Sequence, residues 1–175
     1  MTEQLVITAL GEDRPGIVDE LSHTLSAHEL NIEDSRMSVL GGEFAILMLV
    51  TGSTNSVNAF IDETSALEGS LRMKLLVKPT RKKTESRTLA PYAVEVVSMD
   101  HPGIVRDIAK FFSSRKINII ELDTSRYAAA HTGTPMFALH MTVEIPASQP
   151  ISKLREEFVS MCDELNLDAK MTAKI

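Results

Sequence analysis

The chain has 175 residues and a formal net charge of −6, with 43% hydrophobic and 24% charged residues, as is typical of soluble globular proteins. The acidic balance argues against broad affinity for nucleic acid, which depends on Lys and Arg side chains that neutralise phosphates. No apolar run approaches the length of a membrane span, and the first four residues lack the basic start of a signal peptide. Because the single cysteine also rules out an internal disulfide framework, we expect a cytoplasmic protein.

A hexapeptide near the start of the chain recurs 87 residues later. Residues 13–18 read DRPGIV and residues 100–105 read DHPGIV, and an Asn-Ile pair follows each copy at the same distance. A fixed offset across a whole unit indicates a duplication. We therefore predict two domains, residues 1–78 and 89–175, joined by a linker at 79–88.

The first domain is predicted to have the order β-α-β-β-α-β. Pro15 is well placed in the first turn of a helix, because its missing N–H has no helical partner there. Apolar residues then recur at helical spacing and predict one inward stripe, made of Ile17, Val18, Leu21 and Leu25. Gly41-Gly42 is a good two-residue hairpin turn. The strands are predicted at 5–10, 31–40, 43–51 and 71–78, and the second helix follows the capping residues 52–55.

The charge is distributed unevenly between the domains and the linker. Residues 1–78 contain twelve Asp and Glu against five Lys and Arg, whereas residues 79–88 contain four basic residues and one acidic residue. The acidic first domain could dock on a basic protein surface. The basic linker is either a solvated tether or a contact for an acidic surface or nucleic acid.

The second domain repeats the pattern. Its strands are predicted at 89–99, 118–127, 136–145 and 167–175. Val105, Ile108 and Phe112 are expected to face inward at the positions of Val18, Leu21 and Leu25. A last helix begins at 150–152 and is predicted to turn Leu154, Phe158, Met161, Cys162 and Leu165 inward.

This element order, repeated twice, predicts two ferredoxin-like domains of the α+β class. Each would be a four-stranded antiparallel sheet with both helices on one face. Residues 44–50 are apolar on both sides of their strand. We therefore expect the other sheet face or an edge to be buried as well, either by packing of one domain on the other or in a homodimer.

Catalytic chemistry has little support in the sequence. The chain has no Gly-x-Ser-x-Gly elbow, no phosphate-cradling glycine loop and no His-Glu-x-x-His helix. His23 and His28 are five residues apart on a helix and so do not share a face for a metal. Cys162 lies on an inward stripe, where a small buried hydrophobe is a better account than a nucleophile. We expect no enzymatic activity, no cofactor and no metal.

The repeated turn has the composition of a site for an amino-acid zwitterion. N–H groups at a helix start favour a carboxylate, and Gly16 or Gly103 lets a ligand approach the backbone. Asp13 or Asp100 would take the ammonium group. Asn31 and Asn118 begin the next strand and could complete such a site across an interface between two domains.

A purely structural reading explains the same residues. Aspartate would cap the helix, Pro-Gly would form the turn, and asparagine would end the helix in a left-handed conformation. The two readings are compatible if one copy keeps the binding site and the other keeps only the structure.

Both domains resemble ACT domains, whose signature combines this element order with Pro-Gly at the first strand-to-helix turn and Asn-Ile after the helix. Two free-standing units with such turns are similar to the repressor family of the glycine cleavage system. The resemblance implies a cytoplasmic regulator that binds a small amino acid, glycine above all, and acts through a DNA-binding transcriptional activator protein without touching nucleic acid or membrane. The predicted ligand-binding residues are Asp13, Arg14, Pro15, Gly16, Ile17, Asn31, Ile32, Asp100, His101, Pro102, Gly103, Ile104, Asn118 and Ile119.

Two departures from the family pattern bear on this site. Glu29 and Lys116 stand two residues before Asn, where ACT domains often have glycine. The turns also differ, because Arg14 could pair with a carboxylate whereas His101 could do so only when protonated. The two turns are therefore not expected to bind the same ligand equally well.

Three other functions remain open at this point. The chain could be the regulatory subunit of an enzyme of amino-acid metabolism, since ACT domains often have that role. It could be a purely structural dimerisation module, or a nucleic-acid binder that uses the basic residues Arg81, Lys82, Lys83 and Arg87.

Overall fold

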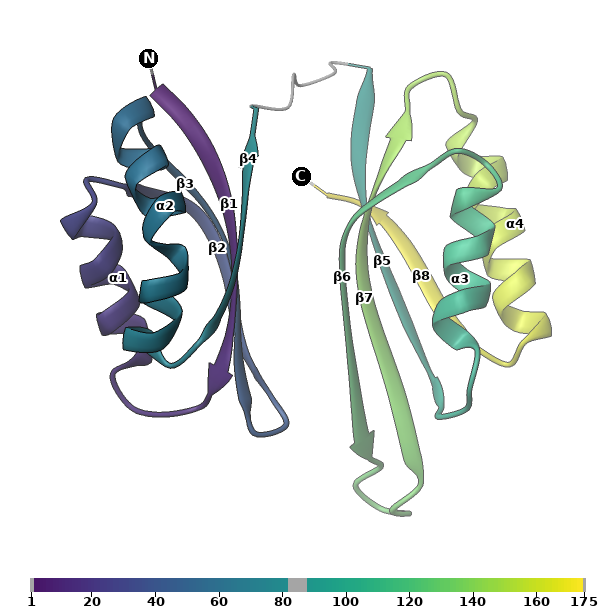
Figure 1. Cartoon of the computed structure of the whole chain (residues 1–175). Helices are drawn as coiled ribbons and strands as arrows, with labels where there is room; N and C mark the ends of the chain where they lie inside the picture. Colours follow the sequence, from purple (N-terminus) through teal and green to yellow (C-terminus); the bar gives the residue numbers. More distant parts are fainter. Residues whose placement is uncertain (1, 82–87, 175) are drawn as a thin grey trace. The chain divides into compact units, whose positions relative to one another are not determined.

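The computed structural model divides the chain into two compact units, Met1–Thr84 and Glu85–Ile175, and describes residues 2–81 and 88–174 (Figure 1). Each unit has the order β-α-β-β-α-β, which confirms the predicted α+β fold. Most of the predicted linker, residues 82–87, lies outside the described residues. None of the described helices is both long enough and apolar enough to cross a lipid bilayer.

The elements of the two units correspond one to one. Unit 1 contains β1 (Thr2–Glu12), α1 (Ile17–Ala27), β2 (Asn31–Leu40), β3 (Glu43–Ser53), α2 (Thr54–Leu71) and β4 (Lys74–Thr80). Unit 2 contains β5 (Leu89–Met99), α3 (Ile104–Ser113), β6 (Asn118–Ala128), β7 (Pro135–Pro146), α4 (Ile151–Glu164) and β8 (Asp168–Ala173).

Each unit is a fully antiparallel sheet with both helices on the same face (Figure 1). The strand orders are β2-β3-β1-β4 and β6-β7-β5-β8. The first strand of each unit is therefore central and hydrogen-bonded on both sides. Alternate residues of the central strands, such as Leu5, Ile7 and Ala9 of β1, are fully buried beneath the helices.

Two predicted core positions, Val18 and Val105, are wrong, whereas the predicted core position Ile17 is confirmed. Val18 and Val105 are 40% and 39% exposed, while the residues before them, Ile17 and Ile104, are buried. The reason is that each helix begins at the isoleucine, so a spacing of four residues points Ile17 and then Leu21 toward the core.

The predicted start of the fourth strand at residue 71 is also wrong. Leu71 is the last residue of α2 and is buried, and β4 begins only at Lys74. Arg72 caps the helix in a left-handed conformation, with φ of 53°, and turns the chain into the strand. The strand then runs to Thr80, two residues into the predicted linker.

Glycine is required at the start of α1 and α3 by backbone geometry. Gly16 and Gly103 are the N-cap residues and have φ of 89° and 102°. This left-handed region is costly for any residue that carries a Cβ. A Cβ added to Gly16 would have ample space, because its nearest neighbour would be the Glu20 Oε1 atom at 3.8 Å. Conformation, and not crowding, therefore selects glycine here.

Arg14 fixes the turn of unit 1 to both helices. Its Nη1 and Nη2 atoms donate to the two carboxylate oxygens of Glu20 at 2.6 and 2.5 Å, and Nη2 also donates to the Leu71 carbonyl oxygen at 3.1 Å. This bidentate hydrogen bond lowers the pKa of the Glu20 carboxyl below its ordinary value of 4.5.

We expect Gly16→Ala to lower the free energy of unfolding of unit 1 by about 1 kcal/mol, because alanine would be forced into the left-handed region. Gly69→Ala is the matched control. Gly69 lies within α2 with nothing within 4 Å of an added Cβ, so alanine should stabilise that helix by about 0.5–1 kcal/mol. Urea unfolding measures both variants, and a shift of equal sign in the two would contradict this account.

Glu20→Gln should destabilise unit 1 at pH 7 and have progressively less effect in acid. The pKa of Glu20 is lowered in the folded state, so its stabilising contribution is present above the unfolded pKa and disappears as the pH falls through the folded one. The unfolding midpoints of wild type and variant should therefore approach each other as the pH falls below the unfolded pKa of about 4.3. In an Arg14→Gln background, Glu20→Gln should change the midpoint little at any pH.

Candidate functional site

The repeated turn lies at one end of each sheet and is tied to the neighbouring hairpin. The Asp13 N–H donates to the Gly42 carbonyl oxygen at 3.1 Å, and the Asp100 N–H donates to the Pro135 carbonyl oxygen at 2.9 Å. Neither aspartate caps the helix that follows, because the N-cap residue is glycine and no side chain donates or accepts at the cap. The structural reading of these aspartates as helix caps is therefore wrong.

The two aspartates differ in their ion pairs. The Asp100 Oδ2 atom lies 2.8 Å from the Arg126 Nε atom on β6. Arg126 pairs with Phe137 in the register of β6 and β7, and the equivalent residue of unit 1, opposite Phe44, is Val39. Across residues 2–81 and 88–174, Asp13 has no ion-pair partner. The carboxylate that remains available for a cationic group is therefore that of Asp13.

The two residues that follow the aspartates also differ. The donors of Arg14 are occupied by Glu20 and by the Leu71 carbonyl, so a ligand carboxylate would have to compete for them. His101 is exposed, and its Nδ1 atom lies 3.2 Å from the Pro102 carbonyl oxygen. In the turn of unit 1, the Asp13 carboxylate is free and the Arg14 guanidinium is already hydrogen-bonded within the protein. In the turn of unit 2, the Asp100 carboxylate is paired with Arg126 and the His101 imidazole is exposed.

The asparagines lie at the other end of each sheet. Asn31 pairs with Thr51, which pairs with Gln4, whereas the turn follows Glu12 at the far end of β1. Eight residues along β1, from Gln4 to Glu12, separate the position of Asn31 from the start of the turn, which corresponds to about 26 Å. Within one unit the structure does not bring Asn31 together with Asp13, and the same register separates Asn118 from Asp100 in unit 2.

The asparagines also do not end the helices. The left-handed residues after α1 and α3 are Glu29 and Lys116, with φ of 55° and 56°. The next N–H closes each helix end, from Leu30 to the Leu25 carbonyl oxygen at 2.9 Å and from Ile117 to the Phe112 carbonyl oxygen at 3.0 Å. This conformation explains why ACT domains often have glycine at that position, and it corrects the structural reading of the asparagines.

Asn31 is exposed beside a glutamate. Its Nδ2 atom donates to the Glu33 Oε1 atom at 3.3 Å, and the Thr51 hydroxyl donates to the same oxygen at 2.8 Å. Glu33 occupies the irregularity in the pairing of β2 with β3 between Ile32 and Asp34. The side-chain amide of Asn31 is thus oriented by a neighbouring carboxylate.

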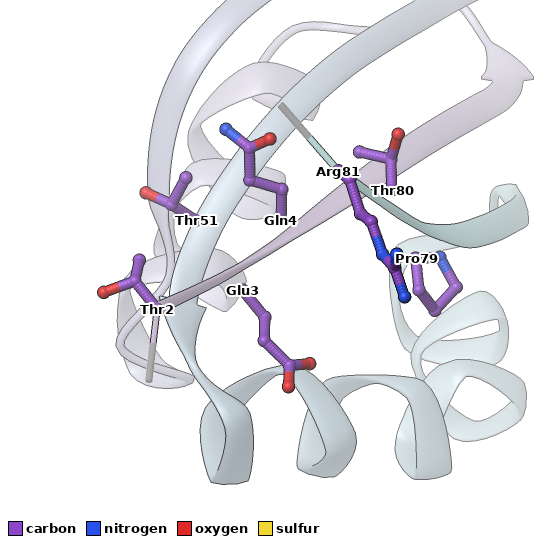
Figure 2. A pocket seen from close by; sticks show the side chains of 7 residues that line it. All are labelled: Thr2, Glu3, Gln4, Thr51, Pro79, Thr80 and Arg81. Carbon is purple, nitrogen blue, oxygen red and sulfur yellow. The ribbon is translucent and has the colours of Figure 1, made fainter. Parts of the chain in front are cut away.

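A hollow that the sequence did not indicate lies at the asparagine end of unit 1. It has a volume of about 940 Å³ and is open to solvent. Figure 2 shows the seven side chains that line this hollow. Thr51, the register partner of Asn31, lines it, but none of the predicted ligand-binding residues does. The lining residues are Thr2, Glu3, Gln4, Thr51, Pro79, Thr80 and Arg81.

A second hollow, of about 600 Å³, lies at the turn end of unit 1. Its wall carries both signs of charge, with Glu12 and Glu43 from the sheet and Arg72 and Lys74 from the segment after α2. Glu12 directly precedes Asp13. Opposite charges a short distance apart are what an amino-acid zwitterion requires. The larger hollow also carries both signs, in Glu3 and Arg81, but only this second hollow lies beside the predicted turn.

The described residues contain neither a reactive thiol nor a cluster of metal ligands. Cys162 is fully buried in α4, and desolvation, assisted by Asp163, raises the pKa of its thiol to about 11. Such a thiol is not a nucleophile at neutral pH. In residues 2–81 and 88–174, no three His, Cys, Asp or Glu side chains converge on a possible metal position.

Comparison with known proteins identifies the family. The ACT domain model matches residues 3–78. The chain is 34% identical over 163 residues to the glycine cleavage system transcriptional repressor of Escherichia coli, a match that covers 93% of this chain and 85% of the relative. A repressor of the same name from Shigella flexneri matches equally well.

Solved structures agree with this assignment over the whole chain. A protein of unknown function from Galdieria sulphuraria has a TM-score of 0.81 and 26% identity, and the match covers 100% of both chains. A structure with the provisional name of glycine cleavage system transcriptional repressor has a TM-score of 0.73 and 27% identity, and the match covers 98% of this chain and 97% of the other. The chain therefore belongs to the ACT-domain family that includes the glycine cleavage system transcriptional repressor.

Proposed function

We propose that this protein is an amino-acid-responsive regulator that represses transcription of glycine cleavage genes by binding a DNA-binding activator. The observation that carries the proposal is the 34% identity to a repressor of that name across 93% of the chain. The match covers both units, so no part of the chain of domain size is left for a separate enzyme domain. A net charge of −6 is consistent with regulation through protein contact.

Glycine is the proposed ligand, and the turn of unit 1 is its proposed site. The Asp13 carboxylate is free to accept from the ligand ammonium group, whereas Asp100 is already paired with Arg126. The start of α1 offers backbone N–H groups to the ligand carboxylate, and Gly16 leaves the approach to them open. Unit 1 therefore carries the stronger charge complementarity to a zwitterion.

A ligand can act on the partner only through a difference in affinity. Glycine must bind one conformation of the regulator more tightly than another in order to shift the equilibrium between them. The activator, in turn, must bind these conformations with different affinities. By linkage, the activator must then change the affinity for glycine by the same factor.

Calorimetric titration with glycine tests the ligand and its site together. Asp13→Asn keeps the size of the side chain but removes the charge, so we expect glycine affinity to fall about 10- to 100-fold. Asp100→Asn is the matched control in unit 2 and should change the affinity less than about threefold. Loss of affinity in Asp100→Asn alone would place the site at the other turn, and absence of binding by wild type would remove glycine from the proposal.

Electrophoretic mobility of promoter DNA tests the mode of repression. The protein alone should not shift DNA from the control region of the glycine cleavage genes at physiological salt. Added to the complex of that DNA with its activator, it should change the mobility, and glycine should alter the concentration required. A direct, salt-sensitive shift that is lost in Arg81→Ala would contradict the proposal and would support nucleic-acid binding through the basic linker.

A further inference from the structure

The two sheets differ sharply on the face away from the helices, which we call the open face. In unit 1, the central row across the strands is Arg36, Leu47, Thr8 and Leu76, as the registers of β2, β3, β1 and β4 show. Leu47 is 49% exposed and Leu76 is 70% exposed. Large apolar side chains are thus presented to solvent in the middle and at one edge of this sheet.

The equivalent row of unit 2 is charged. It consists of Asp123, His140, Glu95 and Lys170, which pair across β6, β7, β5 and β8. The offset of 87 residues places Glu95 at the position of Thr8, and His140 and Lys170 then correspond to Leu47 and Leu76. Along this central row, two copies of one fold therefore carry apolar side chains in unit 1 and charged ones in unit 2. The apolar character is not a requirement of the fold.

The rows on either side of the centre of unit 1 add a charge pattern. One row reads Asp34, Leu49, Val6 and Lys78 from the β2 edge to the β4 edge. The row on the other side of the centre contains Ala45 and Leu10 between Ser38 and Lys74. The open face thus has an apolar middle, a carboxylate on one edge and lysines on the opposite edge.

We propose that the open face of unit 1 binds the open face of unit 1 in a second copy of this chain. A two-fold axis parallel to the strands places β3 of one subunit over β1 of the other, and β2 over β4. Each row of one subunit then lies over the same row of the other subunit, with the order of its residues reversed. Asp34 of one subunit faces Lys78 of the other, and Leu47 and Leu49 cover Thr8 and Val6.

Both the charges and the shape favour a second copy as the occupant. The charges of one row are self-complementary about this axis, because Asp34 and Lys78 occupy the same row on opposite edges. In the central row, Arg36 lies over Leu76 of the second subunit, which its aliphatic stem can cover. Aligned packing of two twisted sheets about 10 Å apart is a standard arrangement. Asp34 already lies 2.5 Å from Arg36, and Lys78 of the second subunit would add a cation to that pair.

The size of the face sets the expected strength of association. Four strands about 4.8 Å apart and eight residues long cover roughly 500 Å² of flat area, against about 800 Å² of surface per partner in a standard interface. We therefore expect a reversible dimer that dissociates on dilution in the micromolar range and does not depend on glycine.

Sedimentation equilibrium of the full chain over a dilution series measures the dissociation constant. The double variant Leu47→Ser/Leu76→Ser should raise it about 100-fold, because two large apolar side chains are removed from the buried face. The matched control is His140→Ser/Lys170→Ser, at the equivalent positions of unit 2, which should leave it unchanged. Circular dichroism and urea unfolding establish that both variants remain folded.

A charge exchange tests the orientation of the two subunits. Lys78→Asp and Asp34→Lys should each raise the dissociation constant about tenfold, because each places like charges face to face. The variant that carries both substitutions should recover most of this loss. If each single substitution weakens the dimer and the double variant weakens it further, the proposed axis is wrong.

The other possible occupants of the face give different results. A wild-type chain that stays monomeric at 100 µM or above, roughly the top of the range expected for so small a face, would overturn the proposal. If Leu47→Ser/Leu76→Ser leaves a dimer intact, the dimer uses another surface. If that variant is monomeric like the wild type but no longer binds the activator, the occupant is the activator and not a second copy.

Discussion

The central position of the first strand in each unit is the constraint on which the rest of the structure depends. β1 pairs with β3 on one side and β4 on the other, as β5 does with β7 and β8. A strand buried on one face and hydrogen-bonded along both edges leaves only its open face and its two ends for polar chemistry. The Pro-Gly turn occupies one end and the asparagine level lies at the other, which is why a single unit cannot place both groups around one small ligand.

The fold was predictable because its signals are local and repeated. The strand at 31–40 and the strand at 89–99 have their predicted bounds, and the hairpin at Gly41-Gly42 forms as expected. Errors arose where a boundary depends on a neighbouring element. The start of α1 at Ile17 decides which of two adjacent apolar residues is buried, and a left-handed cap at Arg72, which no local motif marks, decides where α2 ends.

The candidate site was predictable in its residue types but not in its electrostatics. The pairing of Asp100 with Arg126 joins the turn after β5 to β6. The offset of 87 residues equates Arg126 with Val39, but only the structure reveals that Arg126 contacts the aspartate of the turn. The same holds for the attachment of Arg14 to Glu20 and to the end of α2. The two copies of the turn share their backbone conformation but differ in the side chains that contact it, Glu20 in unit 1 and Arg126 in unit 2.

The single thiol makes the second unit observable by itself. Cys162 is buried beneath the sheet of unit 2, its pKa is raised to about 11, and it is the only cysteine of the chain. A thiol reagent therefore reacts only when this core opens, and its rate reports local or global unfolding of the C-terminal half without any contribution from the N-terminal half. The native sequence thus contains a site-specific label for the stability of one of its two duplicated halves.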